Sequence, residues 1–196
     1  MKERYFPIHP DDEFNRELVN NVRPPEWTNP EPADRYHFVV IGAGSAGLIS
    51  ALGAAGLGAR TAIIENRLYG GDCLNYGCVP SKGLIRSSRA AAEARHGEEF
   101  GLRGGDEMDV DFSAAMKRMR RLRARISKND SAYRLKEQGI DVFIGDAKFI
   151  SRDTIEVGGR MLKFARAVIA TGASPVVPPV PGLKESGCHT NETIFS

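Results

Sequence analysis

A glycine-rich turn between two apolar segments is the feature that most constrains how this chain can fold. Residues 38–41 (FVVI) form a continuous apolar run, which is typical of a strand buried on both faces in a parallel sheet. The turn GAGSAG follows at residues 42–47, and residues 46–57 continue as an alanine-rich helix. A second apolar strand at residues 61–64 completes a strand–helix–strand unit. GxGxxG in this context predicts a Rossmann-like α/β fold that binds a dinucleotide.

Each glycine of this turn has its own physical role. Gly42 permits the tight turn, Gly44 lets backbone approach a diphosphate, and Gly47 lets the helix pack closely on the strand. The diphosphate would then rest on the helix N-terminus, where free amides favour an anion. Glu65 ends the second strand, where its carboxylate would accept hydrogen bonds from a ribose diol and would repel a 2′-phosphate. The pattern predicts FAD or NAD rather than NADP; the competing interpretation is a glycine-rich turn that binds nothing.

The composition is that of an ordinary globular domain and disfavours several classes of function. The 41% hydrophobic and 27% charged residues are average values, and a net charge of +2 gives no reason to expect nucleic acid or a membrane surface as a partner. Residues 38–59 carry no charge, but their glycines and charged flanks favour the strand–turn–helix over a membrane span. With no visible secretory leader and only three cysteines, we expect a cytoplasmic protein.

The chain divides into three predicted parts. Residues 1–35 are expected to form an extended, proline-rich N-terminal arm with a short helix at about residues 12–20. Trp27 in this arm would pack on the domain or on a partner, and a loose tail is the alternative. Residues 36–174 would form the α/β domain. Residues 175–196 begin with several prolines and are predicted to be a linker.

Two helices are predicted after the second strand. The first runs from Pro80, in its first turn, to about His96. The second begins near Phe112 and continues into the 130s, with basic residues on its solvated outer faces. Binding of phosphate or nucleic acid is the less favoured interpretation of these basic residues. The apolar stripe is Phe112, Met116, Met119, Leu122 and Ile126, and the basic run is Lys117, Arg118, Arg120, Arg121, Arg123 and Arg125.

After Gly139 the apolar period changes to two, which predicts short strands. We expect these strands to form a small antiparallel β-meander, with turns at glycines. A further buried strand is expected at residues 167–170, ending at Thr171-Gly172. The predicted meander strands are residues 142–144, 147–150, 154–157 and 161–164.

Two cysteines stand five positions apart in GGDCLNYGCVPSK, residues 70–82. In a regular helix this offset places the Cα atoms about 8.6 Å apart, whereas a disulfide needs less than about 7 Å. A bridge between Cys73 and Cys78 therefore requires a bend, which Gly77 allows. Cys78 would begin the next helix, whose N-terminus stabilises a thiolate, and Lys82 would add positive charge one turn later. We predict a redox-active pair in which Cys73 is the more accessible thiol.

Two other interpretations of the cysteine pair stay open. The cysteines could be buried and structural, although a glycine-rich, partly polar segment suits that role poorly. They could instead form half of a zinc site completed by Cys188 and His189. Adjacent residues rarely supply two ligands to one tetrahedral ion, so we predict no metal site.

Together these motifs resemble the class I flavoprotein disulfide reductases, also called pyridine nucleotide-disulfide oxidoreductases. The resemblance is carried by GAGSAGLISALGAAGLG, by the strand ending at Glu65 and by GGDCLNYGCVPSK, and it runs from Tyr36 to the C-terminus. The chain is most similar to the mercuric-reductase-like and dihydrolipoamide-dehydrogenase-like branches. The resemblance implies an FAD-dependent oxidoreductase that passes electrons from NAD(P)H to a Cys73–Cys78 disulfide and then to a disulfide or metal-ion substrate.

The resemblance also implies roles for individual residues. Cys78 would be the flavin-proximal charge-transfer thiol, Cys73 the interchange thiol, and Lys82 a neighbour of flavin N5. These three would be the catalytic residues. The residues implied to bind FAD, from its adenosine to its flavin, are Gly42, Gly44, Ser45, Ala46, Gly47, Glu65, Gly71, Asp72, Cys73, Lys82, Ala147, Thr171 and Gly172.

The sequence departs from the family's pattern in two respects. Many relatives have threonine in place of Asp72, and a carboxylate is not an obvious substitute beside a diphosphate. A second GxGxxG domain for NAD(P)H and a dimerisation domain with its His–Glu pair do not occur in this sequence. We therefore expect a fragment of a homodimeric enzyme that turns over poorly alone. The alternative is a non-catalytic FAD-binding subunit, or a split-gene half, that needs a partner chain.

Overall fold

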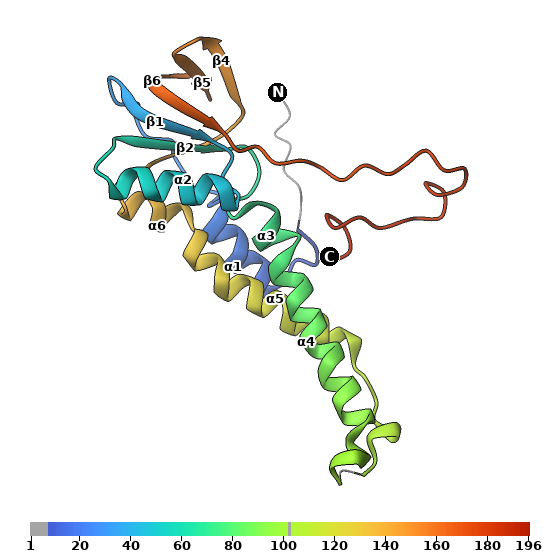
Figure 1. Ribbon diagram of the computed structural model, residues 1–196. Helices are drawn as coiled ribbons and strands as arrows, with labels where there is room; N and C mark the ends of the chain where they lie inside the picture. Colours follow the sequence, from blue (N-terminus) through green and yellow to red (C-terminus); the bar gives the residue numbers. More distant parts are fainter. Residues whose placement is uncertain (1–7, 102) are drawn as a thin grey trace.

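The computed structural model describes residues 8–101 and 103–196. It contains a sheet with helices packed beneath it and a hairpin of two long helices that projects from them (Figure 1). The strands are β1 Tyr36–Ile41, β2 Thr61–Glu65, β3 Asp141–Ile144, β4 Ala147–Ser151, β5 Thr154–Val157 and β6 Arg160–Ile169. The α-helices are α1 Glu13–Val22, α2 Ser45–Gly56, α3 Gly71–Asn75, α4 Cys78–Arg95, α5 Phe112–Ser127 and α6 Ala132–Glu137. Short 3₁₀ turns are η1 Gly97–Phe100, η2 Gly105–Glu107 and η3 Lys128–Asp130.

The sheet has the strand order β3-β2-β1-β6-β5-β4, in which β3, β2, β1 and the second half of β6 run parallel. The first half of β6 pairs antiparallel with β5, and β5 pairs antiparallel with β4. The parallel sheet with an antiparallel meander is confirmed, with two corrections. Residues 142–144 belong to the parallel sheet, and the two strands expected at 161–164 and 167–170 are one continuous strand. A single strand can serve both parts because its two halves bond to different neighbours.

Both faces of the parallel sheet are buried, which explains its continuous apolar runs. Val40, Ile63 and Val142 face the helices, where they contact a core that includes α2 and α6. Val39 and Phe143 point to the opposite face, which the meander covers with its own apolar side chains. Successive residues of a strand alternate between faces, so a strand covered on both sides has no polar face to show in the sequence. The meander residues in this second core are Ile155, Val157, Leu162 and Phe164.

The N-terminal segment is part of the core, which corrects the expectation of an extended arm. Helix α1 confirms the helix expected near residues 12–20, and Leu18 and Val22 are fully buried in the main core. Trp27 packs on the domain, as one interpretation predicted, and its indole N–H donates to the Val142 carbonyl at 3.2 Å. Residues 1–7 of the expected arm lie outside the described residues. The many prolines and acidic residues of this segment made it resemble an exposed arm, and only two apolar residues of α1, Leu18 and Val22, are buried.

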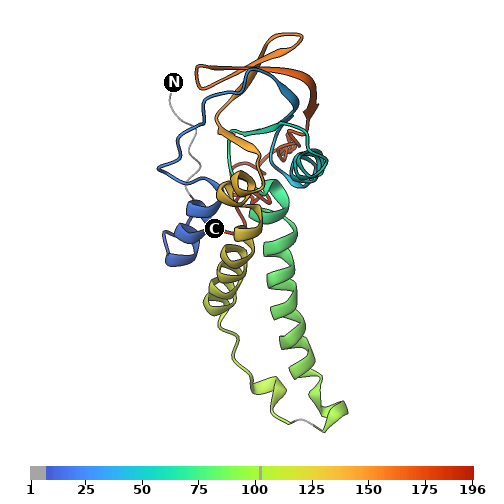
Figure 2. The same cartoon turned by 90° about the vertical axis from the view of Figure 1, so that its left-hand side faces the viewer.

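Helices α4 and α5 lie side by side and project from the sheet (Figures 1 and 2). The expected helix into the 130s is broken, because η3 follows Ser127 and Ser131 caps a separate helix, α6. The apolar stripe is only partly right: Met116 and Met119 are buried, but Phe112 and Ile126 are exposed. In the part of the chain that the structure describes, no helix combines the length and apolarity that a membrane span needs.

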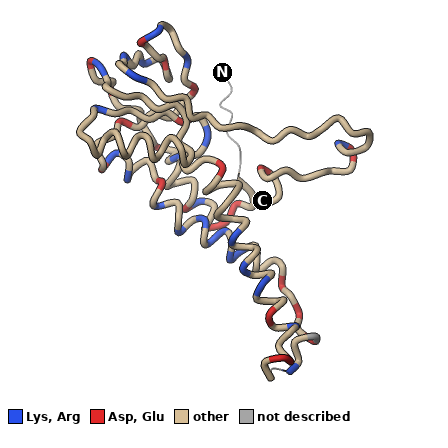
Figure 3. Tube along the Cα trace, in the orientation of Figure 1, with Lys and Arg blue, Asp and Glu red and all other residues tan. Residues whose placement is uncertain are grey.

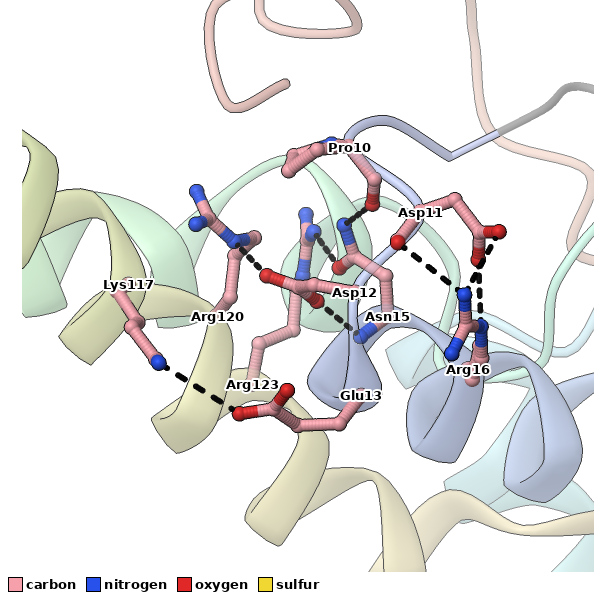
Figure 4. Close-up of polar contacts among 9 residues, drawn as sticks. All are labelled: Pro10, Asp11, Asp12, Glu13, Asn15, Arg16, Lys117, Arg120 and Arg123. Atoms are coloured by element: carbon pink, nitrogen blue, oxygen red, sulfur yellow. Dashed lines mark hydrogen bonds and ion pairs between the residues drawn. The ribbon is translucent and has the colours of Figure 1, made fainter.

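The basic run of α5 has a neighbour that the sequence analysis did not foresee. Lys and Arg recur along this helix (Figure 3), and two of them form ion pairs at the start of α1, Lys117 with Glu13 and Arg120 with the N-cap residue Asp12. The best paired is Arg120, whose Nε lies 2.6 Å from an Asp12 carboxylate oxygen (Figure 4). Arg123, expected on a solvated face, is only 2% exposed. The exposed pair of Lys117 and Glu13 contributes at most about 1 kcal/mol, whereas the pair of Arg120 and Asp12 is largely withdrawn from solvent.

Candidate functional site

The glycine turn between β1 and α2 has no room for side chains at its first and third glycines. Gly42 has φ +97°, and a Cβ there would lie 2.3 Å from the Ala170 carbonyl oxygen. A Cβ on Gly47 would lie 1.9 Å from the Gly42 carbonyl oxygen. Both distances are far inside van der Waals contact, so β1, the end of β6 and α2 can meet only at glycine. The positive φ of Gly42 agrees with the tight turn expected there, and the contact at Gly47 agrees with the close packing of helix on strand expected at that position.

The second glycine of the turn faces open space. A Cβ on Gly44 would find only one protein atom within 4 Å, the Gly71 Cα at 3.8 Å. Gly44 is also the N-cap of α2 and makes no side-chain cap bond, and the next two residues, Ser45 and Ala46, are exposed. An uncapped helix N-terminus at an open glycine backbone is what a dinucleotide diphosphate requires. The residues present therefore fit the cofactor that the sequence implies.

Glu65, at the end of β2, lies beside the turn. Its two carboxylate oxygens accept hydrogen bonds from the backbone N–H groups of Ala43 at 2.8 Å and Arg67 at 2.7 Å. The side chain is only half-buried. Glu65 thus holds the turn in shape, a contact that the sequence analysis did not include, while its expected bond to a ribose stays a prediction.

The cysteine segment packs directly on the glycine turn. Gly71 begins α3 with φ +56°, and a Cβ there would lie 2.5 Å from the Gly44 Cα. The Ser45 side chain lies beside the Cys73 thiol and acts against the net rise in the pKa of that thiol. Two motifs separated in the sequence therefore meet at the N-terminus of α2.

The segment between the cysteines is bent, as a close approach of the two thiols requires. Helix α3 ends at Asn75 and α4 begins at Cys78, with the break at Tyr76 and Gly77. A Cβ on Gly77 would lie 2.8 Å from a carboxylate oxygen of Asp72 and 3.0 Å from its carbonyl oxygen, so the break is crowded and a side chain there would displace Asp72. The bend and the helix start at Cys78 confirm the expected local structure.

Both cysteines are free thiols in the structure, and their bridged form stays a prediction. Cys78 is exposed and Cys73 is half-buried, which corrects the expectation that Cys73 is the more accessible thiol. The reason is that Cys73 lies in the short helix against α2, whereas Cys78 opens α4 at the surface. Lys82, one turn beyond Cys78, is exposed.

Hydrogen bonding to the Cys78 side chain, together with burial, raises the pKa of the Cys73 thiol. The backbone N–H of Cys78 and the Ser45 side chain act in the opposite direction. Because only the thiolate is a nucleophile, a raised pKa leaves less reactive Cys73 at a given pH. We expect Cys73 to be alkylated by iodoacetamide with a pH midpoint above the ordinary cysteine value, and Cys78→Ala to lower that midpoint. Mass spectrometry of the modified peptide over a pH series measures both, and equal midpoints in the two proteins would contradict the prediction.

The other predicted cofactor residues gather at the carboxyl ends of the parallel strands. Thr171 directly follows the residue that contacts Gly42, and its Cα would lie 3.1 Å from a Cβ on that glycine. The loop leading to Ala147 is joined to β2, because the Gly145 N–H donates to the Glu65 carbonyl at 2.9 Å. This edge of an open parallel sheet is where ligands bind. Gly172 is exposed at the same end of β6.

Asp72, at the start of the cysteine segment, is exposed, and its Oδ1 accepts a hydrogen bond from Asn191 at 2.6 Å. Asn191 belongs to residues 175–196, which contain no helix or strand and whose Phe195 is buried against α5. These contacts do not test the linker role predicted for residues 175–196, which stays a prediction. Asn75, which the sequence analysis missed, donates from its amide to the carbonyls of Tyr69 and Gly71 at 3.1 and 2.9 Å.

The alternative zinc site is not assembled. Within residues 8–101 and 103–196, no three side chains of His, Cys, Asp or Glu come together in a way that could hold a metal ion. Cys188 and His189 lie in the C-terminal segment.

Comparison with known proteins agrees with this arrangement. The family model described as "Pyridine nucleotide-disulphide oxidoreductase" matches residues 36–196. The chain is 35% identical over 151 residues to the dihydrolipoyl dehydrogenase of Acholeplasma laidlawii, covering 77% of this chain and 45% of that protein. It is 34% identical over 160 residues to the mercuric reductase of Bacillus cereus, covering 82% of this chain and 25% of that protein.

A solved structure shares the fold. The copper(II) complex of the HOCl-induced flavoprotein disulfide reductase RclA from Escherichia coli superimposes with a TM-score of 0.61 at 30% identity. The match covers 76% of this chain and 31% of that one. The chain therefore spans less than half of the length of the relatives it matches.

Proposed function

Because this chain belongs to the pyridine nucleotide-disulphide oxidoreductase family, we propose that it supplies the FAD-binding and dithiol part of a reductase. The family depends on FAD and takes its electrons from NAD(P)H. One observation carries the proposal: the cysteine segment packs on the dinucleotide turn through Gly71 and Gly44, with Cys73 beside Ser45. A thiol pair held at the cofactor's binding turn can exchange electrons with that cofactor.

When bound, FAD supplies a carrier that takes two electrons from NAD(P)H and delivers them to a disulfide. The residues of this chain would bind and orient it. The N-terminus of α2 would hold the diphosphate, Glu65 would orient the adenosine ribose, and Lys82 would place a positive charge near the flavin. Thr171 and Gly172 would border the flavin at the end of β6.

The cysteines would then carry the electrons to substrate. Two electrons and two protons convert the Cys73–Cys78 disulfide into two thiols. A thiolate of the pair attacks a substrate disulfide, the second thiolate closes the cysteine bridge again, and two substrate thiols leave. With a divalent metal ion as substrate, the same two electrons would reduce the ion. The dihydrolipoyl dehydrogenase and mercuric reductase relatives support these two substrate classes.

We further propose that the complete protein is a cytoplasmic homodimer. A dithiol that NAD(P)H re-reduces in every cycle is in keeping with a reducing compartment, and the family that the sequence resembles is homodimeric. Cell fractionation and light scattering on the protein that contains this chain would test the two points, and a membrane-associated or monomeric enzyme would contradict them.

The experiment that tests the proposed function uses the chain with added FAD. The chain is first oxidised with glutathione disulfide, and bound FAD is then reduced anaerobically by light with a sacrificial donor. We expect FAD fluorescence to change on binding, and two new thiols per chain to appear on illumination. Binding without new thiols would instead favour the non-catalytic FAD-binding subunit. No FAD binding would refute both.

A further inference from the structure

The buried guanidinium of Arg123, on α5, links this helix to α1 and α3, and Figure 4 shows its contact with Asn15 of α1. The side chain projects from α5 and is only 2% exposed. Its Nη1 donates to the Asn75 carbonyl at 2.8 Å, and its Nη2 donates to Asn15 Oδ1 at 2.8 Å. Burial lowers its pKa to about 10, so the group is still protonated at neutral pH. A charge kept in the interior and bonded to two uncharged acceptors is costly, which calls for an explanation.

The first of these acceptors lies between the two cysteines. Asn75 is the last residue of α3, the helix that carries Cys73, and the carbonyls at a helix end lack partners within the helix. The Arg123 guanidinium supplies the missing hydrogen-bond donor for the Asn75 carbonyl. The side-chain amide of Asn75 also donates to the carbonyls of Tyr69 and Gly71, and so ties the end of α3 to the residues around its start. Arg123 therefore fixes the backbone at the point where the chain bends from one cysteine toward the other.

The second acceptor lies on α1, outside the residues that the family model matches. Asn15 is itself only 2% exposed. Its amide nitrogen donates to the Pro10 carbonyl at 2.7 Å, and its backbone N–H donates to Asp12 Oδ1 at 2.9 Å. Asn15 is thus held from both sides, and its remaining oxygen faces Arg123. Through Asn15 and Arg123, the N-terminal segment is hydrogen-bonded to the cysteine segment.

We propose that Arg123 is a positioning residue for the Cys73–Cys78 pair, and that Asn15 of the N-terminal helix holds Arg123 in place. This inference rests on the proposed function of the pair. The physical effect is on effective concentration: a fixed bend keeps the two sulfurs within reach, which favours the disulfide over the dithiol. Releasing the Asn75 carbonyl lets α3 and α4 separate and lowers that effective concentration.

The test measures the dithiol–disulfide equilibrium of the full chain in glutathione buffers. In this reaction the two thiols and one glutathione disulfide give one protein disulfide and two glutathione thiols, so atoms and electrons balance. We expect Arg123→Met to lower the equilibrium constant for the protein disulfide about tenfold, which for a two-electron couple is about 30 mV. Arg123→Lys keeps the charge and one donor, and should recover part of the loss. Asn15→Leu should give a loss of about threefold.

Arg120→Met is the matched control, because Arg120 binds Asp12 across the same α1–α5 contact but has no bond to α3. Asp12 also accepts the Asn15 backbone N–H, so Arg120→Met acts on Arg123 only indirectly and should change the equilibrium less than Asn15→Leu does. Circular dichroism and thermal melting check that each variant folds. If Arg123→Met does not fold, the measurement on Asn15→Leu tests the inference in its place. The inference would be overturned if Arg123→Met raised the equilibrium constant for the protein disulfide or left it unchanged. It would also be overturned if Arg120→Met lowered this constant by the same factor as Arg123→Met.

The failure of the inference and the failure of the proposed function can be told apart. A wild-type chain that forms no Cys73–Cys78 disulfide in any buffer contradicts the proposed function. A wild-type chain that forms the disulfide, together with variants that match it, contradicts the positioning role alone.

Discussion

Replacing Cys73 or Cys78 with serine is expected to remove the light-driven release of thiols completely. Neither variant can form the disulfide that receives the two electrons, because one sulfur is missing. In the complete protein, we expect each replacement to lower the rate of substrate reduction about 10⁴-fold or more, the size of loss that follows removal of one member of a covalent catalytic unit. Thiol titration before and after illumination measures the first effect, and steady-state kinetics measures the second.

The third cysteine of the chain supplies the control. Cys188 lies in the C-terminal segment and is also a free thiol. Cys188→Ser should lower the starting thiol count by one and leave the gain on illumination unchanged. A Cys188→Ser protein that behaves like Cys73→Ser would mean that the wrong pair has been assigned.

Alanine substitutions at two glycines of the same turn are expected to affect different properties. Gly47→Ala should lower the stability of the fold, and Gly44→Ala should lower the affinity for FAD. Gly47→Ala places a methyl group 1.9 Å from the Gly42 carbonyl oxygen, which forces α2 away from β1. We expect a loss of stability of about 3 kcal/mol or more, at the upper end for overpacking. Gly44→Ala meets no protein atom closer than 3.8 Å, so the free protein should melt like the wild type. Its methyl group would occupy the space of the diphosphate and weaken FAD binding about tenfold or more.

Thermal unfolding without FAD and an FAD fluorescence titration measure these two effects on the same samples. Each variant is the control for the other, because both add one methyl group to the same turn. Equal melting temperatures of the two variants would contradict the packing role of Gly47, and unchanged FAD affinity in Gly44→Ala would show that the open side of the turn does not receive the cofactor.

Most of the local structure was predictable because it depends on short-range rules. The strand–turn–helix of β1 and α2, the second strand and the bend at Gly77 follow from apolar period, glycine placement and cysteine spacing. The misplaced elements share a different cause. The strand at residues 142–144 has the same apolar pattern in a meander as in a parallel sheet, and only its pairing with β2 distinguishes them. Pairing partners are remote in sequence, so no local pattern identifies them.

The sequence by itself determined the dinucleotide turn, the two thiols and their family, because these depend on residue types at fixed spacings. Only the tertiary structure decided that the two motifs touch, that Cys78 is the exposed thiol and that the N-terminal segment belongs to the core. Arg123 shows the reason most clearly. As one arginine in a basic run it is typical of a solvated face, and its burial comes from acceptors on α1 and α3. Such acceptors lie far away along the chain, and folding alone brings them to one point.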